Sequence, residues 1–420
     1  MREMKDSGIA WIGAIPNHWK VSKIKQIVCW KSVKGQPDLP VLSLYRDYGV
    51  VPKDSRDDNH NVTSLDTSGY KVVERGDLVI NKMKAWQGSL AVSEYNGIVS
   101  PAYHICKITS EKICKKYLHY LLRDASYLPE YMRLSTGLRV GQWDLSFDDF
   151  KNIPFLVPPL AEQDRIAAFL DAECAEIDAL LEKTRASIEE YKKLKQAVIT
   201  QAVTKGVRGD RPMKDSGIEW IGEIPAEWDV LNLVAHTSML TPMRDRPENL
   251  DGPIPWVRIE DFEGKYIESS KAGLGVSMKT VKEMNLKVYP VGTILCTSSC
   301  IMGKCAIVSR ELVSNQRFIG IIPDRTTDKT YLYYLMTSNA ERMNFLSTGA
   351  LQANLSRSAF EHLKVQFPPY SEQQEIVAYL DDKCEKIDAL IARKQQYLTE
   401  IENYKKSLIY EYVTGKKEVV

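Results

Sequence analysis

The chain has 420 residues, with 56 Lys and Arg against 55 Asp and Glu and a formal net charge of +1. This balance argues against a generic basic coat for nucleic acids, although local patches can still bind DNA. No apolar run approaches ~20 residues and the charged N-terminus lacks an apolar stretch, so the sequence predicts neither a membrane helix nor a secretory signal. The eight cysteines do not resemble a disulfide framework in a chain of this length, which favours a reduced, cytoplasmic protein.

The chain opens with a segment that recurs about half a chain later. Residues 4–21 read MKDSGIAWIGAIPNHWKV, and residues 213–230 read MKDSGIEWIGEIPAEWDV. An internal repeat of this kind indicates a tandem duplication and therefore two similar halves. The segment contains Trp, Ile and Pro but no ionisable cluster, so we interpret it as a packing strap and not as a ligand site.

Two blocks, 22–153 and 231–363, lie between the repeats and match each other only in fragments. Their short apolar runs, separated by Gly, Asn, Asp and Ser, are typical of α+β domains. Helices are expected at 115–123 and 329–337. Strands are expected at 39–44, 77–81, 90–93, 255–259, 292–296 and 306–309.

A loop at a matching position follows one strand in each block, 82–87 in the first and 297–302 in the second, yet the residues of the two loops are unrelated. A loop that keeps its place while its chemistry changes is a good place for recognition. The candidate contacts in these loops are Lys82, Lys84, Trp86, Gln87, Thr297, Ser298 and Ser299.

A second pair of loops follows the repeated Leu-Ser-Thr-Gly at 134–137 and 346–349. Arg suits guanine, whereas Gln and Asn suit adenine, each through two hydrogen bonds to the base edge. The alternative is a polar loop with solvated side chains. The candidate base contacts are Arg139, Gln142, Gln352, Asn354 and Arg357, and the candidate phosphate contacts are Lys82, Lys84, Lys304 and Arg317.

Three cysteines, Cys296, Cys300 and Cys305, are clustered in the second block, which raises the question of a zinc site. Alignment of the two blocks places Cys296 opposite Ile80 and Cys305 opposite Leu90, at apolar strand positions. We therefore expect no metal site in the chain.

A long segment with a helical apolar stripe closes each half, and the two segments align without a gap at 158–204 and 368–414. Apolar or small residues recur in steps of three and four over about 43 residues, which is a heptad stripe. The double Pro before each segment stops the preceding strand, and Ser371 with Gln374 fits a capping box. We expect the two helices to form an antiparallel pair that spaces two globular domains; the alternative is that each helix packs on its own block.

Catalytic signatures are missing from the sequence. Phe367-Pro368-Pro369-Tyr370 resembles the Asp/Asn-Pro-Pro-Tyr element of amino-methyltransferases, but the Phe cannot hydrogen-bond an amine. Gly303-Lys304 lacks the rest of a phosphate loop. The six histidines are scattered, and no nucleophile, base and acid form a set. We therefore predict no catalytic residue in the chain.

The duplicated MKDSGIxWIGxIP opening, the two divergent blocks, and the PPLAEQ and PPYSEQ elements that run into IDAL-bearing helices resemble the specificity subunit of Type I restriction-modification enzymes. The resemblance covers essentially the whole chain. It implies an α+β fold with two globular target-recognition domains, a spacer of two long antiparallel helices that form a coiled coil, and an internal pseudo-twofold repeat. The implied divisions are a first recognition domain at 1–156, a first helical spacer at 157–209, a second recognition domain at 210–366 and a second spacer at 367–420.

The resemblance also implies a function and partners. In that family each recognition domain reads one half of a split sequence in double-stranded DNA, and the paired helices set the gap between the halves. The subunit has no catalytic activity and no cofactor of its own; it recruits two adenine methyltransferase subunits that carry S-adenosylmethionine, and ATP-dependent restriction subunits can join them. Docking is assigned largely to the helices, whose outer faces include the candidates Arg165, Asp171, Glu182, Asp381 and Lys383, with a solvated helix face as the alternative.

Two other functions compete with DNA specificity. A bivalent protein scaffold would use the same architecture to hold two proteins apart without DNA. A stand-alone nuclease or methyltransferase would need acidic or cofactor motifs that the sequence lacks.

Overall fold

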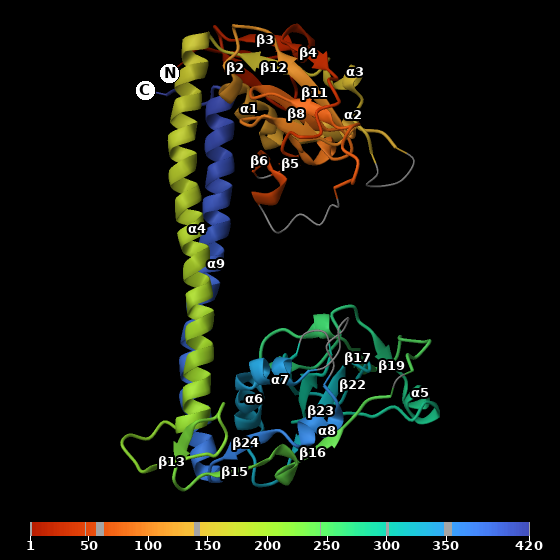
Figure 1. Ribbon diagram of the computed structural model, residues 1–420, viewed down its shortest axis with the longest axis vertical. Coiled ribbons are helices and arrows are strands. Elements are labelled where there is room, and N and C mark those ends of the chain that lie inside the picture. Colours follow the sequence, from red (N-terminus) through yellow and green to blue (C-terminus); the bar gives the residue numbers. More distant parts are fainter. Residues whose placement is uncertain are drawn as a thin grey trace. The chain divides into compact units, whose positions relative to one another are not determined.

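A computed structural model of the chain describes residues 2–46, 48–55, 63–137, 143–243, 245–299, 302–347 and 355–419. The chain folds into two compact units, drawn in Figure 1 in the colours of the sequence. Unit 1 consists of Met1–Arg185 together with Gln396–Val420, and unit 2 consists of Ala186–Gln395. Packing thus assigns one end of each long helix to each unit, whereas the division expected from the sequence kept the helices as separate segments.

The two long helices are α4 (Leu160–Lys205) and α9 (Tyr370–Val413). The remaining elements of unit 1 are β1 (Met4–Asp6), β2 (Ala14–Pro16), β3 (Lys20–Lys23), β4 (Val28–Lys31), β5 (Leu42–Tyr45), β6 (Gly49–Pro52), β7 (Lys71–Val73), β8 (Asp77–Asn81), β9 (Leu90–Val92), β10 (Gly97–Val99), β11 (Tyr103–Ile108), α1 (Lys115–Arg123), α2 (Leu128–Leu134), α3 (Phe147–Phe150) and β12 (Pro154–Val157).

The remaining elements of unit 2 repeat much of this order. They are β13 (Met213–Asp215), β14 (Glu223–Pro225), β15 (Asp229–Asn232), β16 (Thr237–Leu240), β17 (Ile254–Val257), β18 (Tyr266–Ile267), β19 (Gly275–Val276), α5 (Met278–Glu283), β20 (Ile294–Thr297), β21 (Cys305–Val308), β22 (Val313–Ser314), β23 (Phe318–Pro323), α6 (Lys329–Ser338), α7 (Ala340–Leu346), α8 (Arg357–Glu361) and β24 (Lys364–Phe367). The predicted bounds of β8 and α1 are confirmed, and the other predicted strands and helices of the blocks form within three residues of the expected limits.

An antiparallel sheet lies at the centre of unit 1, with the strand order β4-β11-β8-β9. All five residues of β8 are buried, because both faces of the sheet are covered. On one face Leu78 and Ile80 belong to the main core with Leu118 of α1. On the other face Val79 packs with Leu44 of β5 in a smaller core. The alternation of faces along β8 follows the two-residue period of a strand.

The central sheet of unit 2 has the order β16-β23-β20-β21-β18, so its first four strands match those of unit 1. The additional strand β18 pairs in parallel with β21. A separate sheet of order β19-β17-β22 has no equivalent order in unit 1, where β7 and β10 form one pair and β5 and β6 another. The α+β fold class expected from the sequence is therefore confirmed, with one shared frame and additions that differ between the units.

The repeated opening segment packs against the core of its own unit. In unit 1, Ile15 and Trp19 are fully buried, and β3 pairs with β12, the strand that leads into α4. In unit 2, Trp228 is likewise fully buried, and β15 pairs with β24, which leads into α9. The segment is therefore a packing strap that ties the start of each half to the beginning of its long helix.

The beginning of each long helix is held by a buried glutamine of the repeated Glu-Gln pair. Gln163 donates to the carbonyl oxygens of Pro158 at 2.8 Å and Lys112 at 3.0 Å, and accepts from the Cys114 backbone N–H at 2.9 Å. Gln373 makes the matching three bonds in unit 2, to Pro368, Thr326 and Asp328. The helix thereby joins the loop before α1 or α6.

The predicted capping box at Ser371 and Gln374 is wrong, because α9 begins at Tyr370 and Ser371 lies inside the first turn. One of the N–H groups in the first turn is satisfied by the backbone instead, because the Glu372 N–H donates to the Pro369 carbonyl at 2.9 Å. A capping residue must precede the first helical residue, and the double Pro occupies that place.

The long helices pair antiparallel within each unit. In unit 1 the residue numbers on α9 fall as those on α4 rise, with ion pairs joining Asp178 to Lys405 at 2.6 Å and Arg185 to Glu402 at 2.7 Å. In unit 2, Lys195 of α4 pairs with Asp388 of α9 at 2.6 Å. The antiparallel pair expected from the sequence is confirmed, and no helix in the described ranges is long and apolar enough to cross a membrane.

The predicted apolar stripes are confirmed on both helices. They also enter the cores of the units, with α4 residues such as Ile166 in the core of unit 1 and α9 residues such as Ile376 in the core of unit 2. Each helix therefore packs on its own block, which was the alternative expected from the sequence, and also pairs with the other helix. Unit 1 receives α9 as well as α4. The stripe residues that are buried are Ile166, Leu170, Cys174, Ile177, Leu181, Ile188, Ala202, Ile376, Leu380, Cys384, Ile387, Ile401 and Leu408.

The glutamate of each Glu-Gln pair anchors the strap. Glu372 has a side chain only 1% exposed, accepts a hydrogen bond from the Trp228 indole N–H at 2.9 Å, and forms an ion pair with Arg211 at 2.5 Å. Glu162 contacts Arg2 at 2.6 Å and His18 at 2.8 Å. Burial alone would raise the pKa of Glu162, but the hydrogen bonds from His18 and Arg2 outweigh burial and hold the pKa below its ordinary value.

We expect Glu372→Gln to lower the free energy of unfolding of unit 2 by about 2 kcal/mol, because a hydrogen-bonded carboxylate is lost beside a buried guanidinium. The measurement is urea unfolding followed by tryptophan fluorescence. Glu375→Gln is the matched control, since Glu375 is half exposed and pairs with Arg208 at the surface; it should cost less than about 1 kcal/mol. Equal losses for the two variants would contradict an anchoring role for Glu372.

The lowered pKa of Glu162 predicts a pH dependence. A carboxyl whose pKa is lower in the folded chain contributes stability that is fully present above the ordinary value of 4.5 and is lost as the pH falls through the folded value. The native chain should therefore unfold at a higher temperature than Glu162→Gln at pH 7, and the difference should shrink below pH 4.5. A constant difference between pH 7 and strongly acidic solution would show that the charge of Glu162 is not involved.

Candidate nucleic-acid interface

The first candidate loop of unit 1 follows β8 and contains a short 3₁₀ turn at Ala85–Gln87, which ends on Gly88 with φ at 83°. The indole N–H of Trp86 donates to the Met83 carbonyl at 3.2 Å, which folds the loop back on itself. Lys84 and Gln87 are exposed. The loop thus presents a cation and an amide from a compact turn, a suitable arrangement for contacts with a polyanion.

The second candidate loop of unit 1 is held against the first. The Leu145 N–H donates to the Lys82 carbonyl at 3.0 Å, the Lys82 ammonium pairs with Asp144 at 2.9 Å, and the rings of Trp86 and Trp143 meet edge to face at 5.2 Å. The predicted base contacts Arg139 and Gln142 lie outside the described residues, in the segment between Thr136 and Asp144, which bridge to each other.

Unit 2 joins its two candidate loops through the same backbone contact. The Leu355 N–H donates to the Ser298 carbonyl at 2.9 Å, and the Ser298 N–H donates to the Arg317 carbonyl at 2.8 Å. Leu355 and its counterpart Leu145 are both buried, and the serine after each caps a short helix, α8 and α3 respectively. The repeated Leu-Ser therefore fixes the second loop to the first in both units.

A cavity of about 490 Å³ lies beside this contact in unit 2. Arg357 lines it and forms an ion pair with Glu361 at 2.7 Å. The predicted base contacts Gln352 and Asn354 lie outside the described residues, just before Leu355. The residues that line the cavity are Thr241, Pro242, Ser298, Gln316, Phe318, Ile319, Leu355 and Arg357.

Two polar candidates of the second block, Thr297 and Ser299, are buried in the free chain, and a contact with DNA stays a prediction for both. Thr297 is fully buried in β20, and its hydroxyl accepts from the Lys304 N–H at 3.1 Å and donates to the Lys304 carbonyl at 3.3 Å. Ser299 is 6% exposed. The strand extends one residue beyond its predicted end, so Thr297 closes the loop instead of projecting from it.

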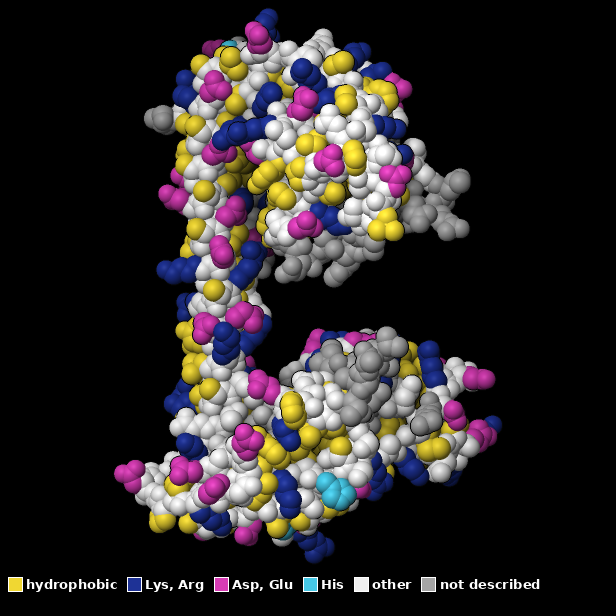
Figure 2. All heavy atoms as spheres, in the orientation of Figure 1, with side chains coloured by type: hydrophobic (Ala, Val, Ile, Leu, Met, Phe, Trp, Pro, Cys, Tyr) yellow, Lys and Arg dark blue, Asp and Glu magenta, His cyan; other side chains and the backbone are white. Residues whose placement is uncertain are grey.

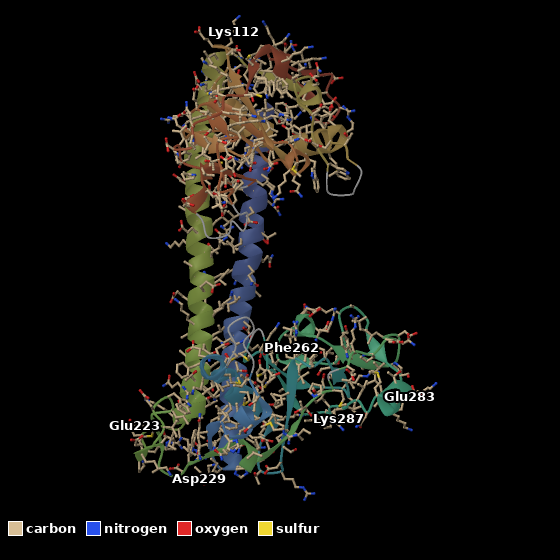
Figure 3. The ribbon with its side chains drawn as sticks, turned by 45° about the vertical axis from the view of Figure 1, so that its right-hand side comes forward. Lys112, Glu223, Asp229, Phe262, Glu283 and Lys287 are labelled. Carbon is tan, nitrogen blue, oxygen red and sulfur yellow. The ribbon has the colours of Figure 1, made fainter. Side chains whose placement is uncertain are left out.

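The two basic candidates of unit 2 differ in whether their side chains contact other residues of the unit. The Lys304 ammonium donates to the Ile259 carbonyl at 3.3 Å and lies 5.8 Å from the ring centroid of Phe262, which Figure 3 labels. Arg317 is exposed, and its guanidinium has no partner in the part of unit 2 that the structure describes. Figure 2 shows basic and acidic side chains interspersed on the visible face of each unit, in line with the near-neutral charge.

Two of the three clustered cysteines lie in neighbouring strands of the central sheet. Cys296 and Cys305 face each other across β20 and β21 with their sulfur atoms 2.7 Å apart. Burial raises the pKa of the Cys296 thiol well above its ordinary value. Cys300 lies outside the described residues. Within the described ranges, no group of three or more His, Cys, Asp or Glu side chains is arranged to hold a metal ion.

Two of the predicted docking residues are engaged inside their own unit. Asp171 accepts from the Tyr120 hydroxyl at 2.8 Å and pairs with Lys116. Asp381 accepts from the equivalent Tyr334 hydroxyl in unit 2 at 2.5 Å and pairs with Lys265, which directly precedes β18. Sequence reasoning missed these tyrosines, although both stand at the same place in the predicted helices. Four of the docking candidates are exposed, namely Arg165, Glu182, Asp381 and Lys383, and a docking role remains a prediction for all five residues.

Comparison with known proteins adds to this geometry. The Type I restriction enzyme MjaIX specificity subunit of Methanocaldococcus jannaschii is 35% identical over 176 residues, which span 39% of this chain and 40% of that protein. The Type I restriction enzyme MjaVIII specificity subunit of the same organism is 23% identical over 442 residues, which span 96% of this chain and 94% of that protein. 

A solved chain from work described as "Structural basis underlying complex assembly and conformational transition of the type I R-M system" has a TM-score of 0.72 at 14% identity and covers 96% of this chain and 99% of its own length, so the two share a fold. A family model described as Type I restriction modification DNA specificity domain matches residues 16–190 and again residues 229–403. Because these matches take in most of both halves, the chain belongs to the Type I restriction-modification DNA specificity family and carries two specificity domains in tandem.

Proposed function

We propose that this chain is the DNA specificity subunit of a Type I restriction-modification complex, in which each unit reads one half of a bipartite sequence in double-stranded DNA. One observation carries the proposal. In both units the same backbone bond, from Leu145 to Lys82 and from Leu355 to Ser298, joins two loops whose residues are otherwise unrelated. A constant frame that presents different polar groups is what two readers of different half-sites require.

We assign the gap between the half-sites to the paired helices. Both α4 and α9 are continuous, and they pair with each other within each unit through ion pairs and a shared apolar stripe. A fixed spacing between half-sites needs a fixed connection between the modules that read them. The same helices are the proposed docking sites for two methyltransferase subunits.

The proposed subunit has no catalytic role of its own. S-adenosylmethionine would be held by the methyltransferase subunits, and ATP by restriction subunits where these join. Methylation requires the target adenine to leave the stack and enter the pocket of a methyltransferase. This chain would select the adenine that is offered, and it would do so in the cytoplasm, where host DNA is accessible.

The proposal is tested by mapping methylated adenines across the host genome with and without the gene. We expect a split motif with two fixed halves and a fixed gap to lose its methylation when the gene is deleted. If no adenine mark changes while the partner methyltransferase is expressed and active, DNA specificity is ruled out and a bivalent protein scaffold is favoured.

Exchange of residues 231–363 for the corresponding block of another family member should change one half of the methylated motif and leave the other half and the gap unchanged. The physical reason is that the recognition loops of each unit belong to that unit alone. The measurement is the same methylation map. The reciprocal control is exchange of residues 22–153, which should change the other half. A change in both halves from a single exchange would contradict the assignment of one half-site to each unit.

Arg317 and Arg325 provide a matched pair for the DNA contact, because they flank opposite ends of β23 and both are exposed. Arg317→Ala should reduce affinity for duplex DNA and lower the slope of log affinity against log salt by about 0.9, the value for one lost phosphate contact. Arg325→Ala removes the same charge and should leave both quantities unchanged. Similar losses in the two variants would indicate only a general effect of net charge.

A further inference from the structure

Unit 1 buries a lysine that forms no ion pair within the described residues of the unit. Lys71 is 9% exposed, and its ammonium donates to the Tyr103 carbonyl at 2.6 Å. No carboxylate pairs with Lys71 in the part of unit 1 that the structure describes. Burial of a cation without an opposite charge is costly, so a lysine in this position needs a reason other than stability.

A second lysine lies directly across from the first. Lys34 and Lys71 form an antiparallel bridge, and the neighbouring Val72 N–H donates to the Val33 carbonyl at 2.8 Å. Directly opposed residues place their side chains on the same face, about 4.5–5.5 Å apart at Cβ, where like charges repel. Lys34 is exposed, so one lysine of the pair lies in the interior and the other at the surface.

A third lysine comes from the recognition loop. Tyr103, whose carbonyl receives the Lys71 ammonium, is paired in register with Asn81, and Lys82 follows directly. Burial lowers the pKa of Lys71, and the charges of Lys34 and Lys82 lower it further. Asp144 pairs with Lys82 but with neither of the other two lysines. Among the residues that the structure describes, the three ammonium groups therefore have one carboxylate partner, Asp144.

We propose that Lys34, Lys71 and Lys82 form a phosphate-binding site that holds one backbone phosphodiester of the DNA half-site read by unit 1. The proposal rests on the proposed function, because it names the part of the DNA that this loop contacts. A phosphodiester supplies the missing negative charge and accepts hydrogen bonds from several ammonium groups at once. Phosphate contacts of this kind fix the register of a protein on the duplex without reading its sequence.

The corresponding lysine of unit 2 is built differently. Lys287 stands five residues before Gly292, as Lys71 stands five residues before Gly76. Its ammonium donates to the Asn285 side-chain carbonyl at 3.3 Å, and the residue, labelled in Figure 3, is only partly buried. The fold therefore allows a lysine at this position to make an ordinary surface contact, as Lys287 does. The burial of Lys71 beside two other lysines occurs in unit 1.

The test compares Lys71→Met with Lys112→Met in the full chain bound to its methyltransferase. Both variants remove one positive charge from unit 1. Lys112 is exposed and follows the far end of β11, whereas Lys71 contacts the start of that strand. Figure 3 labels Lys112. The affinity for a duplex of mixed sequence, and for a duplex that contains the target motif found by the methylation map, is measured as a function of salt concentration. The midpoint of thermal unfolding is measured as well.

We expect Lys71→Met to weaken both complexes several-fold, to lower the salt slope by about 0.9, and to leave the ratio of the two affinities unchanged. Its unfolding midpoint should be equal to or above that of the native chain, because an uncompensated buried charge is removed. A purely structural role for Lys71 would instead lower the midpoint. Lys112→Met should change neither the slope nor the midpoint.

Three results would overturn the phosphate site. The first is native-like DNA binding by Lys71→Met while the native chain still binds its target, which leaves the proposed function standing. The second is unchanged DNA binding by Lys71→Met together with an unfolding midpoint that added inorganic phosphate raises in the native chain but not in Lys71→Met, which assigns the site to a free anion. The third is failure of the native complex to prefer any sequence, which removes the proposed function together with the site.

Discussion

The constraint on which the structure depends is that the apolar stripe of each long helix must be covered along its whole length. Neither block can do this alone, so the core of unit 1 contains Ile166 and Leu170 of α4 together with Ile401 and Leu408 of α9. The core of unit 2 likewise combines both helices. Hydrophobic burial is the dominant favourable term in folding, and here it joins segments from the two halves of the chain. The straps and the buried Glu-Gln pairs then hold the beginning of each helix in place.

Once the helices and sheets are fixed in this way, the residues of the recognition loops contribute little to the core and need only close a turn. Leu145 and Leu355 fill the core behind them, and the following serines cap short helices. The polar residues between these anchors can differ without cost to the core. This explains how the two blocks kept one frame after duplication while losing nearly all similarity in the loops.

Much of the frame could be predicted from the sequence because it depends on periodicity. The heptad stripe, β8 and α1 follow from apolar spacing that tertiary contacts reinforce. What could not be predicted depends on contacts between residues far apart in the chain. The side chain of Gln163 is bonded to the loop before α1, some fifty residues earlier, and no local sequence pattern marks that contact.

The candidate site was predicted less well than the frame, for related reasons. Thr297 was placed in a loop because nothing local shows that β20 extends to pair it with Phe318. Asp171 was placed on an outer helix face, although Tyr120 reaches it from α1. No feature of the sequence indicated that Lys71 is buried, since lysines are usually exposed. Burial of polar groups is a property of the assembled fold, and the sequence pattern of one segment does not contain it.

The contact between the two ends of the chain has a consequence for its synthesis. Lys416 donates to the Ile12 carbonyl at 3.1 Å, and the backbone at Gly415 lies against Pro16 and Trp19. Unit 2 is a continuous stretch of chain, whereas unit 1 is completed only by residues after Gln396. On the ribosome, the unit whose translation begins first therefore finishes folding last. Its exposed core must stay soluble through the synthesis of some two hundred further residues, so this nascent chain is a natural client for a chaperone.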